Sequence, residues 1–182
     1  MLYFGLTALL LSACSMLPVP VDLGDGLGDL QSGSYSFELP ASFENLNATF
    51  YLPGGSGEES TFEPPNPAPT SAKVRYSVDY EVLAQGVDGL LYITPYFAPD
   101  AEHAFDDAYA LGEPVPLIID GGEHTAAGSV ELTPEQLSLL SRGKAVTGIK
   151  LRAVDLNAPN GTDTEVTFNW SFNELVAEVG IF

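Results

Sequence analysis

Two histidines and a run of acidic residues are the side chains in this sequence that most directly suggest chemistry. Between Arg75 and Arg142 there is no Lys or Arg for 66 residues, and the same stretch carries twelve Asp or Glu and both histidines. Imidazole nitrogens and carboxylate oxygens are ligands for zinc, manganese or iron. A metal site in this stretch would draw on the following side chains: His103, His124, Asp106, Asp107, Asp120 and Glu123.

The spacing of these candidate ligands is not diagnostic of a metal site. His103 and His124 are 21 positions apart, and the sequence contains no HxH or HExxH motif. Loop carboxylates also suit calcium, which prefers oxygen ligands. The alternative is that they are solvated loop acids and ordinary surface histidines. We therefore predict no cofactor and keep calcium as an open alternative.

The sequence offers no catalytic arrangement. A serine hydrolase needs a nucleophile, a base and an orienting acid, but there is no GxSxG motif and only two histidines can serve as bases. A glycosidase needs two facing carboxylates, and 25 acidic residues neither support nor refute such a pair. We therefore predict that the protein is not an enzyme.

Aromatic residues in a long irregular segment suggest a binding site of another kind. Phe105 and Tyr109 lie within residues 98–114, which contain few strand or helix signals. Loops on a rigid scaffold commonly carry binding residues, and aromatic rings can stack on sugars. Phe105 and Tyr109 are therefore the candidate platform for a glycan, whereas Trp170 falls on an apparently buried strand face.

Few cations oppose the acidic residues, so the formal charge is −19. A field of this sign repels polyanions, which excludes nucleic acid as a partner. Lys73 and Arg75 alternate along one predicted strand, and Lys150 and Arg152 along another. If these strands are adjacent, the four cations form a small basic patch for a carboxylate, a phosphate or an acidic partner. The alternative is that these cations form exposed ion pairs with nearby carboxylates, and such pairs contribute little to stability.

The single cysteine, at position 14, excludes a disulfide scaffold. It follows an apolar run over residues 2–11 that is too short for a bilayer span of ~20 residues. The run does match the apolar centre of a secretion signal. It ends in Leu11-Ser12-Ala13-Cys14, which resembles the lipobox of bacterial lipoproteins. The alternative is that Cys14 is a small hydrophobe in a buried segment.

The resemblance implies that residues 1–13 are a signal peptide, removed just before Cys14. Cys14 would then begin the mature chain and carry acyl groups such as palmitate. Several acyl groups give stable anchoring, while the acidic body is repelled by anionic headgroups. Ser15, rather than Asp, follows the cysteine, which resembles lipoproteins sorted to an outer membrane. We therefore expect a lipid-anchored protein of the cell envelope, favouring the outer membrane, facing the periplasm or the surface.

This location suggests the function. We expect a non-enzymatic binding or structural accessory of the envelope, anchored to the membrane through Cys14 and with an envelope protein as partner. The alternative is a ligand-binding β-sandwich module, with a glycan or calcium as its ligand.

Residues 14–34 are expected to form a lipidated flexible tether. Prolines, glycines and aspartates follow one another closely here, as in Asp22-Leu-Gly-Asp25-Gly-Leu-Gly-Asp29. The Asp-Gly run also invites a calcium interpretation, but the alternating acids and final Glu of an EF-hand are missing.

Residues 35–182 are predicted to form one all-β domain. Apolar residues make up 45% of the chain, enough for a core, and from Tyr35 onward they alternate with a period of two, typical of half-buried strands. About eight such segments separated by turn residues predict an antiparallel β-sandwich. The predicted strands cover residues 35–39, 46–52, 73–83, 90–97, 115–119, 128–132, 149–153 and 166–173.

One short helix and two long loops complete the prediction. Thr133-Pro134-Glu135-Gln136 has the residues of a capping box, and Gly143 can end the helix. Residues 53–72, rich in Pro and Gly, and residues 98–114 are expected to be the long exposed loops.

Overall fold

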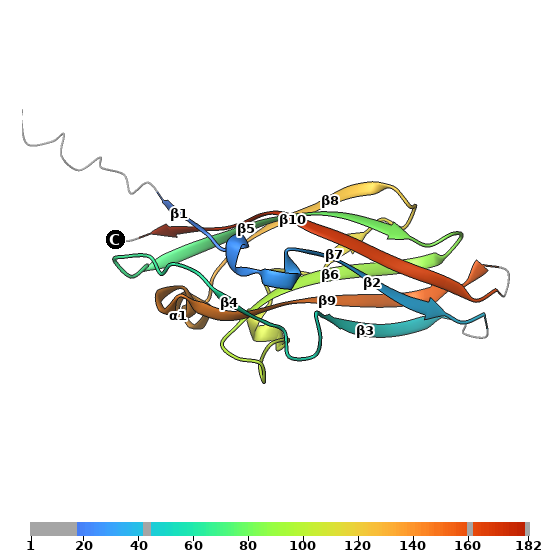
Figure 1. The fold of residues 1–182 in the computed structure, drawn as a ribbon, viewed down its shortest axis with the longest axis horizontal. Coiled ribbons are helices and arrows are strands. Elements are labelled where there is room, and N and C mark those ends of the chain that lie inside the picture. The colour runs from blue at the N-terminus through green and yellow to red at the C-terminus, as the bar shows by residue number, and fades with distance from the viewer. Residues whose placement is uncertain (1–17, 42–44, 160–161, 181–182) are drawn as a thin grey trace, which may run out of the picture.

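The computed structural model describes residues 18–41, 45–159 and 162–180, so Cys14 lies outside the described residues. The described chain folds into two antiparallel five-stranded sheets packed face to face, with one α-helix (Figure 1). The predicted fold class, an all-β antiparallel sandwich with one short helix, is thereby confirmed.

Sheet A is built around the longest strand, β10 (Thr164–Gly180), which pairs with β5 (Ser71–Leu83) along one side. Strand β8 (Glu123–Glu131) pairs with the far side of β5 and forms one edge. The other side of β10 is shared by two short strands. β2 (Ser32–Leu39) pairs with its first half and β1 (Val19–Asp22) with its second half.

Sheet B repeats this plan around β9 (Lys144–Asn157). Strand β6 (Asp88–Ala98) pairs with one side of β9, and β7 (Val115–Leu117) continues the sheet beyond β6. The other side of β9 is again shared, by β4 (Glu58–Thr61) over its first residues and by β3 (Leu46–Leu52) over the remainder.

The core lies between the two sheets, where alternate residues of each strand point inward. In β5 the buried side chains are those at the even positions from Ala72 to Val82, and from Val74 onward they are those that the alternation predicts. Sheet A also contributes Phe168 and Trp170 to the core, and sheet B contributes Ile149 and Leu151. Their neighbours in sequence point to the two outer faces, so each sheet has one buried and one exposed surface.

The N-terminal segment differs from the expected flexible tether. After β1 the chain forms two short 3-10 helices, η1 (Gly24–Gly26) and η2 (Gly28–Leu30). Leu23, Leu27 and Leu30 are each at most 2% exposed and belong to the core. Their spacing places three apolar side chains on one side of the segment, and burying them offsets the loss of chain entropy. From Val19 onward this part of residues 14–34 is therefore folded against the sandwich.

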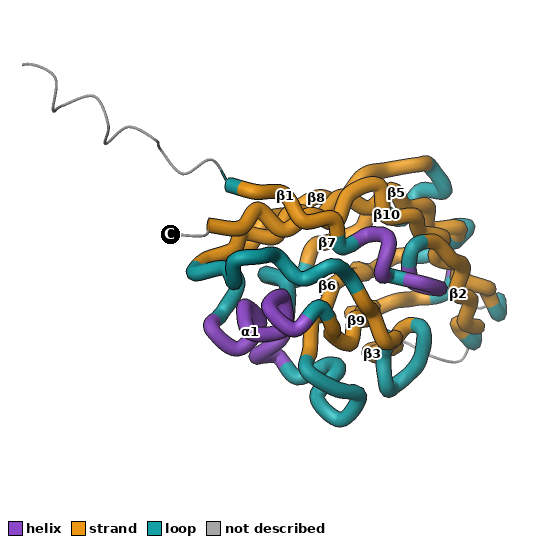
Figure 2. Tube along the Cα trace, turned by 60° about the vertical axis from the view of Figure 1, so that its left-hand side comes forward, coloured by secondary structure: helices purple, strands orange, loops and turns teal. Residues whose placement is uncertain are grey.

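The predicted helix is present as α1 (Pro134–Arg142). The Thr133 hydroxyl accepts a hydrogen bond from the Gln136 amide, and the Gln136 side chain accepts one from the Thr133 amide, so the capping box is complete. Gly143 ends the helix with a φ of 66°. Within the described residues no helix is long and apolar enough to cross a membrane. Figure 2 shows α1 toward the same end of the sandwich as β1 and the end of β10.

The two predicted long loops differ in outcome. Residues 53–72 were expected to be one exposed loop, but they contain β4, whose Ser60 is buried and hydrogen-bonded to Thr147. Short polar strands of this kind show little periodicity, and their pairing with β9 is set by tertiary structure. Residues 98–114 are largely irregular, as predicted, with one 3-10 turn, η3 (Asp107–Tyr109).

Candidate ligand-binding groove

The outer face of sheet B carries a regular grid of polar and aromatic side chains. The central strand β9 presents Arg152 and Lys150 outward. In the strand register Arg152 stands between Thr49 of β3 and Tyr92 of β6. Lys150 stands in the next row, between Tyr51 of β3 and Thr94 of β6. Side chains of directly paired residues lie about 5 Å apart at Cβ, so both rows bring their members into contact range.

The third row of this grid is formed by Gly148 and Tyr96, which pair between β9 and β6. A Cβ atom on Gly148 would lie 2.5 Å from the ring of Phe105. Because Gly148 has no side chain, this ring can pack directly against the backbone of β9. The Phe105 ring centre lies 4.6 Å from that of Tyr51 and 5.6 Å from that of Tyr96. Phe105 therefore packs against two tyrosines on β3 and β6, the strands on either side of β9.

The loop of residues 98–114 is fastened to the same face through Asp107. Lys150 Nζ donates a hydrogen bond to Asp107 Oδ1 at 3.0 Å, and the Tyr96 hydroxyl donates to the same oxygen at 3.2 Å. Lys150 Nζ also lies 4.9 Å from the centre of the Tyr96 ring. Figure 1 shows this loop on the side of β9 that faces away from sheet A.

These contacts shift the titration of all three groups. The hydrogen bond and charge of Lys150 hold the pKa of Asp107 below its ordinary value. Tyr96 is 2% exposed, and this burial raises the pKa of its hydroxyl. Burial alone would lower the pKa of Lys150, but its interactions with Tyr96 and Asp107 outweigh that effect and raise it. Asp107 and Lys150 thus remain ionised around neutral pH.

Arg152 and Thr94 are two of the groups on this face that keep free hydrogen-bonding capacity. The Arg152 guanidinium carbon lies 5.0 Å from the centre of the Tyr92 ring, and the side chain makes no ion pair with a carboxylate of the described residues. Thr94 is 5% exposed, and its hydroxyl has no hydrogen-bond partner among the residues described.

Together these side chains border a groove of about 460 Å³, which we call the sheet-B groove. Its size lies within the range of small-molecule sites. The strands form its floor and residues of the 98–114 loop form its wall. The groove is lined by Thr49, Tyr51, Thr94, Tyr96, Asp107, Ala110, Gly112, Glu113, Pro114, Lys150 and Arg152.

The two candidate aromatic residues have different places. Phe105 contacts the groove residues Tyr51 and Tyr96 but does not line the groove itself. Tyr109 contacts His103, with ring centres 6.4 Å apart, and does not line the groove. The exposed platform is instead Tyr51, which is 42% exposed. Trp170, expected on a buried face, is 8% exposed and confirmed as a core residue.

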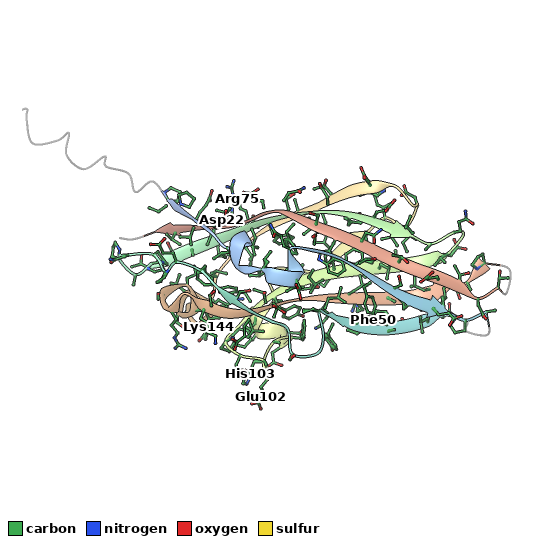
Figure 3. All side chains as sticks on the ribbon, in the orientation of Figure 1. Asp22, Phe50, Arg75, Glu102, His103 and Lys144 are labelled. Carbon is green, nitrogen blue, oxygen red and sulfur yellow. The ribbon has the colours of Figure 1, made fainter. Side chains whose placement is uncertain are left out.

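The candidate metal ligands are not brought together. His103 Nδ1 lies 2.7 Å from Asp100 Oδ1, and His124 Nε2 lies 2.8 Å from Asp120 Oδ1. Each histidine thus has a local carboxylate partner. Figure 3 shows His103 with Glu102 at the outer tip of the 98–114 loop. No group of three or more metal-ligating side chains suited to an ion occurs among the described residues.

A second groove of about 550 Å³ lies on sheet A, bordered by Asp79, Glu81, Glu123 and His124 among others. Two of its three carboxylates have partners, because Asp79 accepts a 2.6 Å hydrogen bond from Thr125 and Glu81 accepts one from Asn169. Hydrogen bonds from the side chains of Asn173 and Thr125 lower the pKa of Asp79. This groove therefore offers an acidic surface whose main acceptors are engaged.

The four alternating cations do not form one basic patch. Lys73 and Arg75 lie on β5 in sheet A, whereas Lys150 and Arg152 lie on β9 in sheet B. Arg75 pairs with Glu174 at 3.1 Å and Glu178 at 3.2 Å, so the alternative of local pairing is correct there. The alternation did show that Lys150 and Arg152 share an outer face. It could not show that Tyr51, Tyr92 and Thr94 stand beside them.

Comparison with known proteins adds little. No model of a known protein family matches the chain, and no curated protein matches it. Among solved structures, infectious bursal disease virus-derived T=1 particles match with 15% identity and a TM-score of 0.36, over 99% of this chain and 36% of that one. Triatoma virus matches with 18% identity and a TM-score of 0.38, over 91% and 67%.

Sacbrood virus of honeybee matches with 12% identity and a TM-score of 0.37, over 92% and 75%. The chain spans about a third of the bursal disease virus chains. At such TM-scores the likeness carries no inference about function. The molecule is thus defined by its own fold and groove, as a β-sandwich with a ligand-sized groove on one outer sheet face.

Proposed function

We propose that this protein is a non-enzymatic, saccharide-binding lipoprotein of the cell envelope. The observation that carries the binding role is the sheet-B groove, which is lined by an exposed aromatic ring, a guanidinium without an ion-pair partner and a threonine hydroxyl without a hydrogen bond among the described residues. The lipobox carries the proposed location, with Cys14 as the lipidated residue.

The side chains of the groove suit a sugar ring. The C–H face of a pyranose packs on the electron-rich face of an aromatic ring, and Tyr51 offers such a face at 42% exposure. Sugar hydroxyls both donate and accept, so Thr49 and Thr94 can pair with them from the floor. A few placed polar groups beside an aromatic surface are typical of small-ligand sites.

The titratable groups of the groove have a positioning role that fits binding better than catalysis. Asp107, Tyr96 and Lys150 are bonded to one another and hold the loop against the sheet. None of the three is left poised to exchange a proton with a ligand. They keep the wall of the groove in place, which reduces the ordering cost when a ligand binds.

The folded N-terminal segment refines the proposed anchoring. Four residues separate Cys14 from Val19, where β1 begins, so their Cα atoms are at most about 18 Å apart. The sandwich would therefore be held close to the lipid surface, with the end that carries β1 and the end of β10 nearest the membrane (Figure 2). Its acidic surface would still be repelled by anionic headgroups.

The binding role is tested by presenting the full chain, in detergent, to an array of immobilised glycans. We expect binding to a defined subset, weakened at least tenfold by Tyr51→Ala. Tyr109→Ala is the control, since this ring lies in the 98–114 loop but does not line the groove, and it should bind like wild type. Absence of glycan binding, or equal loss in both variants, would contradict the proposal.

The anchoring role is tested separately. Membrane fractions of cells producing the full chain should contain a form whose Cys14 carries acyl groups by mass spectrometry. Cys14→Ser should move the protein to the soluble fraction. An unmodified Cys14 in membrane-bound wild-type protein would overturn this part of the proposal.

A further inference from the structure

We propose that the saccharide bound in the sheet-B groove carries an isolated carboxylate, as a uronic acid does, and that Arg152 binds this group. This inference rests on the proposed saccharide-binding function and specifies the ligand class of the same groove.

Arg152 differs from the cations that this acidic chain neutralises. Arg75 contacts two glutamates, Lys144 contacts Glu59 at 3.0 Å, and Lys150 contacts Asp107. Arg152, like Lys73 and Arg142, makes no ion pair among the described residues, but it is the one of these three that lines the sheet-B groove. Its guanidinium lies over the ring of Tyr92, its paired residue on β6. The guanidinium N–H groups are therefore available for two-point binding of a carboxylate.

Thr94 supplies the second, independent feature. Thr94 lines the groove, is 5% exposed as a residue, and its hydroxyl makes no hydrogen bond among the described residues, so it is available to a ligand. Thr94 pairs with Lys150, so Arg152 is its diagonal neighbour, about 7–8 Å away across the sheet. A pyranose can bridge this spacing, with its carboxylate toward Arg152 and a ring hydroxyl toward Thr94.

The backbone of the floor disfavours a peptide ligand. Residues 149–153 of β9 are paired on one side with β3 and on the other with β6. An extended peptide therefore finds no free edge on β9, the strand that carries Arg152. Recognition over this strand comes from side chains, which suits a ring with hydroxyl groups.

The charge balance of the groove favours one carboxylate over many. Asp107 and Glu113 line it together with Lys150 and Arg152, so the local charges cancel, and the whole chain carries −19. A densely sulfated polysaccharide would be repelled by this field. A single carboxylate can be held by Arg152 at close range, where screening matters less.

The test compares matched sugars by calorimetry with the full chain in detergent. The ligands are cellobiouronic acid, a galacturonic-acid-terminated disaccharide, their methyl esters, and heparin. We expect at least one acid to bind about tenfold or more tightly than its ester, and heparin to bind no better than the esters. Arg152→Gln should reduce this acid-to-ester ratio to about one, and Arg152→Lys should leave an intermediate ratio. Arg142→Gln, an exposed cation of α1 outside the groove, should keep the wild-type ratio.

Each other outcome is decisive. Equal binding of acids and esters, or an unchanged ratio in Arg152→Gln, would overturn the carboxylate inference and leave saccharide binding intact. Failure of every glycan on the array would overturn the proposed function itself. Tighter, Arg152-dependent binding of a Glu-rich peptide than of either acid would replace the saccharide with a protein ligand. Thermal unfolding of each variant verifies that it is folded.

Discussion

The indole Nε1 of Trp170 donates a hydrogen bond of 3.0 Å to the carbonyl oxygen of Leu30. This contact joins the core of sheet A to the end of η2. It depends on Gly33, which pairs with Trp170 and whose Cβ would lie 2.5 Å from the indole ring. Together with buried Leu23, Leu27 and Leu30, it explains why a segment rich in Asp and Gly is part of the folded domain.

Trp170→Phe should lower the free energy of unfolding by about 1–3 kcal/mol, because it leaves the Leu30 carbonyl without its partner. Ser171→Ala, at the next and exposed position, should change it little. Denaturant unfolding measures both. Limited proteolysis should also cut residues 24–31 faster in Trp170→Phe, whereas rapid cutting there in the wild type would indicate a mobile tether after all.

Gly148→Ala should displace Phe105, since the new methyl group would occupy the position of the ring edge. We expect a loss of stability of about 1–3 kcal/mol and weaker glycan binding, because Tyr51 loses its contact with this ring. Gly55→Ala is the control, as its Cβ position is open. Glycan binding unchanged in Gly148→Ala would show that Phe105 does not position the groove.

Thr133→Ala removes the side-chain acceptor at the start of α1 and should cost about 0.5–2 kcal/mol. The measurement is urea unfolding monitored by circular dichroism. Ser141→Ala, which removes a hydroxyl near the other end of the helix, should cost clearly less. Equal effects of the two substitutions would argue against the capping box as the source of stability.

The attachment of the 98–114 loop should depend on pH through Asp107. Because the folded state lowers the pKa of this carboxyl, its stabilisation is present above the unfolded value of about 3.9 and is lost as pH falls through the lowered pKa. The NMR signals of the Tyr96 ring should therefore stay constant from neutral pH to about 5 and shift in more acidic solution.

Asp107→Asn should show the shifted Tyr96 signals already at neutral pH, since the charge that holds Lys150 is gone. Asp106→Asn, one position away, should titrate like wild type. A Tyr96 spectrum that is the same in Asp107→Asn and wild type at neutral pH would contradict the proposed fastening of the loop.

His103 provides a second titration with the opposite sign. The hydrogen bond and charge of Asp100 raise the pKa of this imidazole above its ordinary value, so their interaction is fully present below about pH 6.5 and is lost as pH rises through the raised pKa. NMR titration should show a lower His103 pKa in Asp100→Asn than in wild type. The decrease in Asp106→Asn should be clearly smaller.

The sequence was sufficient for most of the fold because strand alternation and helix capping are local signals. The predicted 46–52 segment coincides with β3, and α1 begins and ends where Thr133 and Gly143 predict. The missed strands, β1 and β4, are four residues long and polar or proline-containing. Their strand state comes from pairing with β10 and β9, which no local pattern reveals.

The groove could be predicted only in fragments. Lys150 and Arg152 were correctly placed on one outer face, and Phe105 was singled out as a candidate aromatic residue. Their neighbours Tyr51 and Thr94 come from strands about 50 to 100 positions away in sequence, and strand order and register decide which residues meet. A single sequence contains no signal for that register. The pairing of Arg152 with Tyr92 therefore had to come from the structure.

Binding at the outer face of sheet B is tested by mapping the site of a glycan selected on the array. The map is obtained from ¹H–¹⁵N chemical-shift changes in the full chain. Signals of the sheet-B groove, including Tyr51, Thr94 and Arg152, should shift with rising ligand concentration, while those of Asp79, Glu123 and Asn169 on sheet A stay in place. Shifts confined to the sheet-A residues would contradict the central claim that the outer face of sheet B binds the ligand.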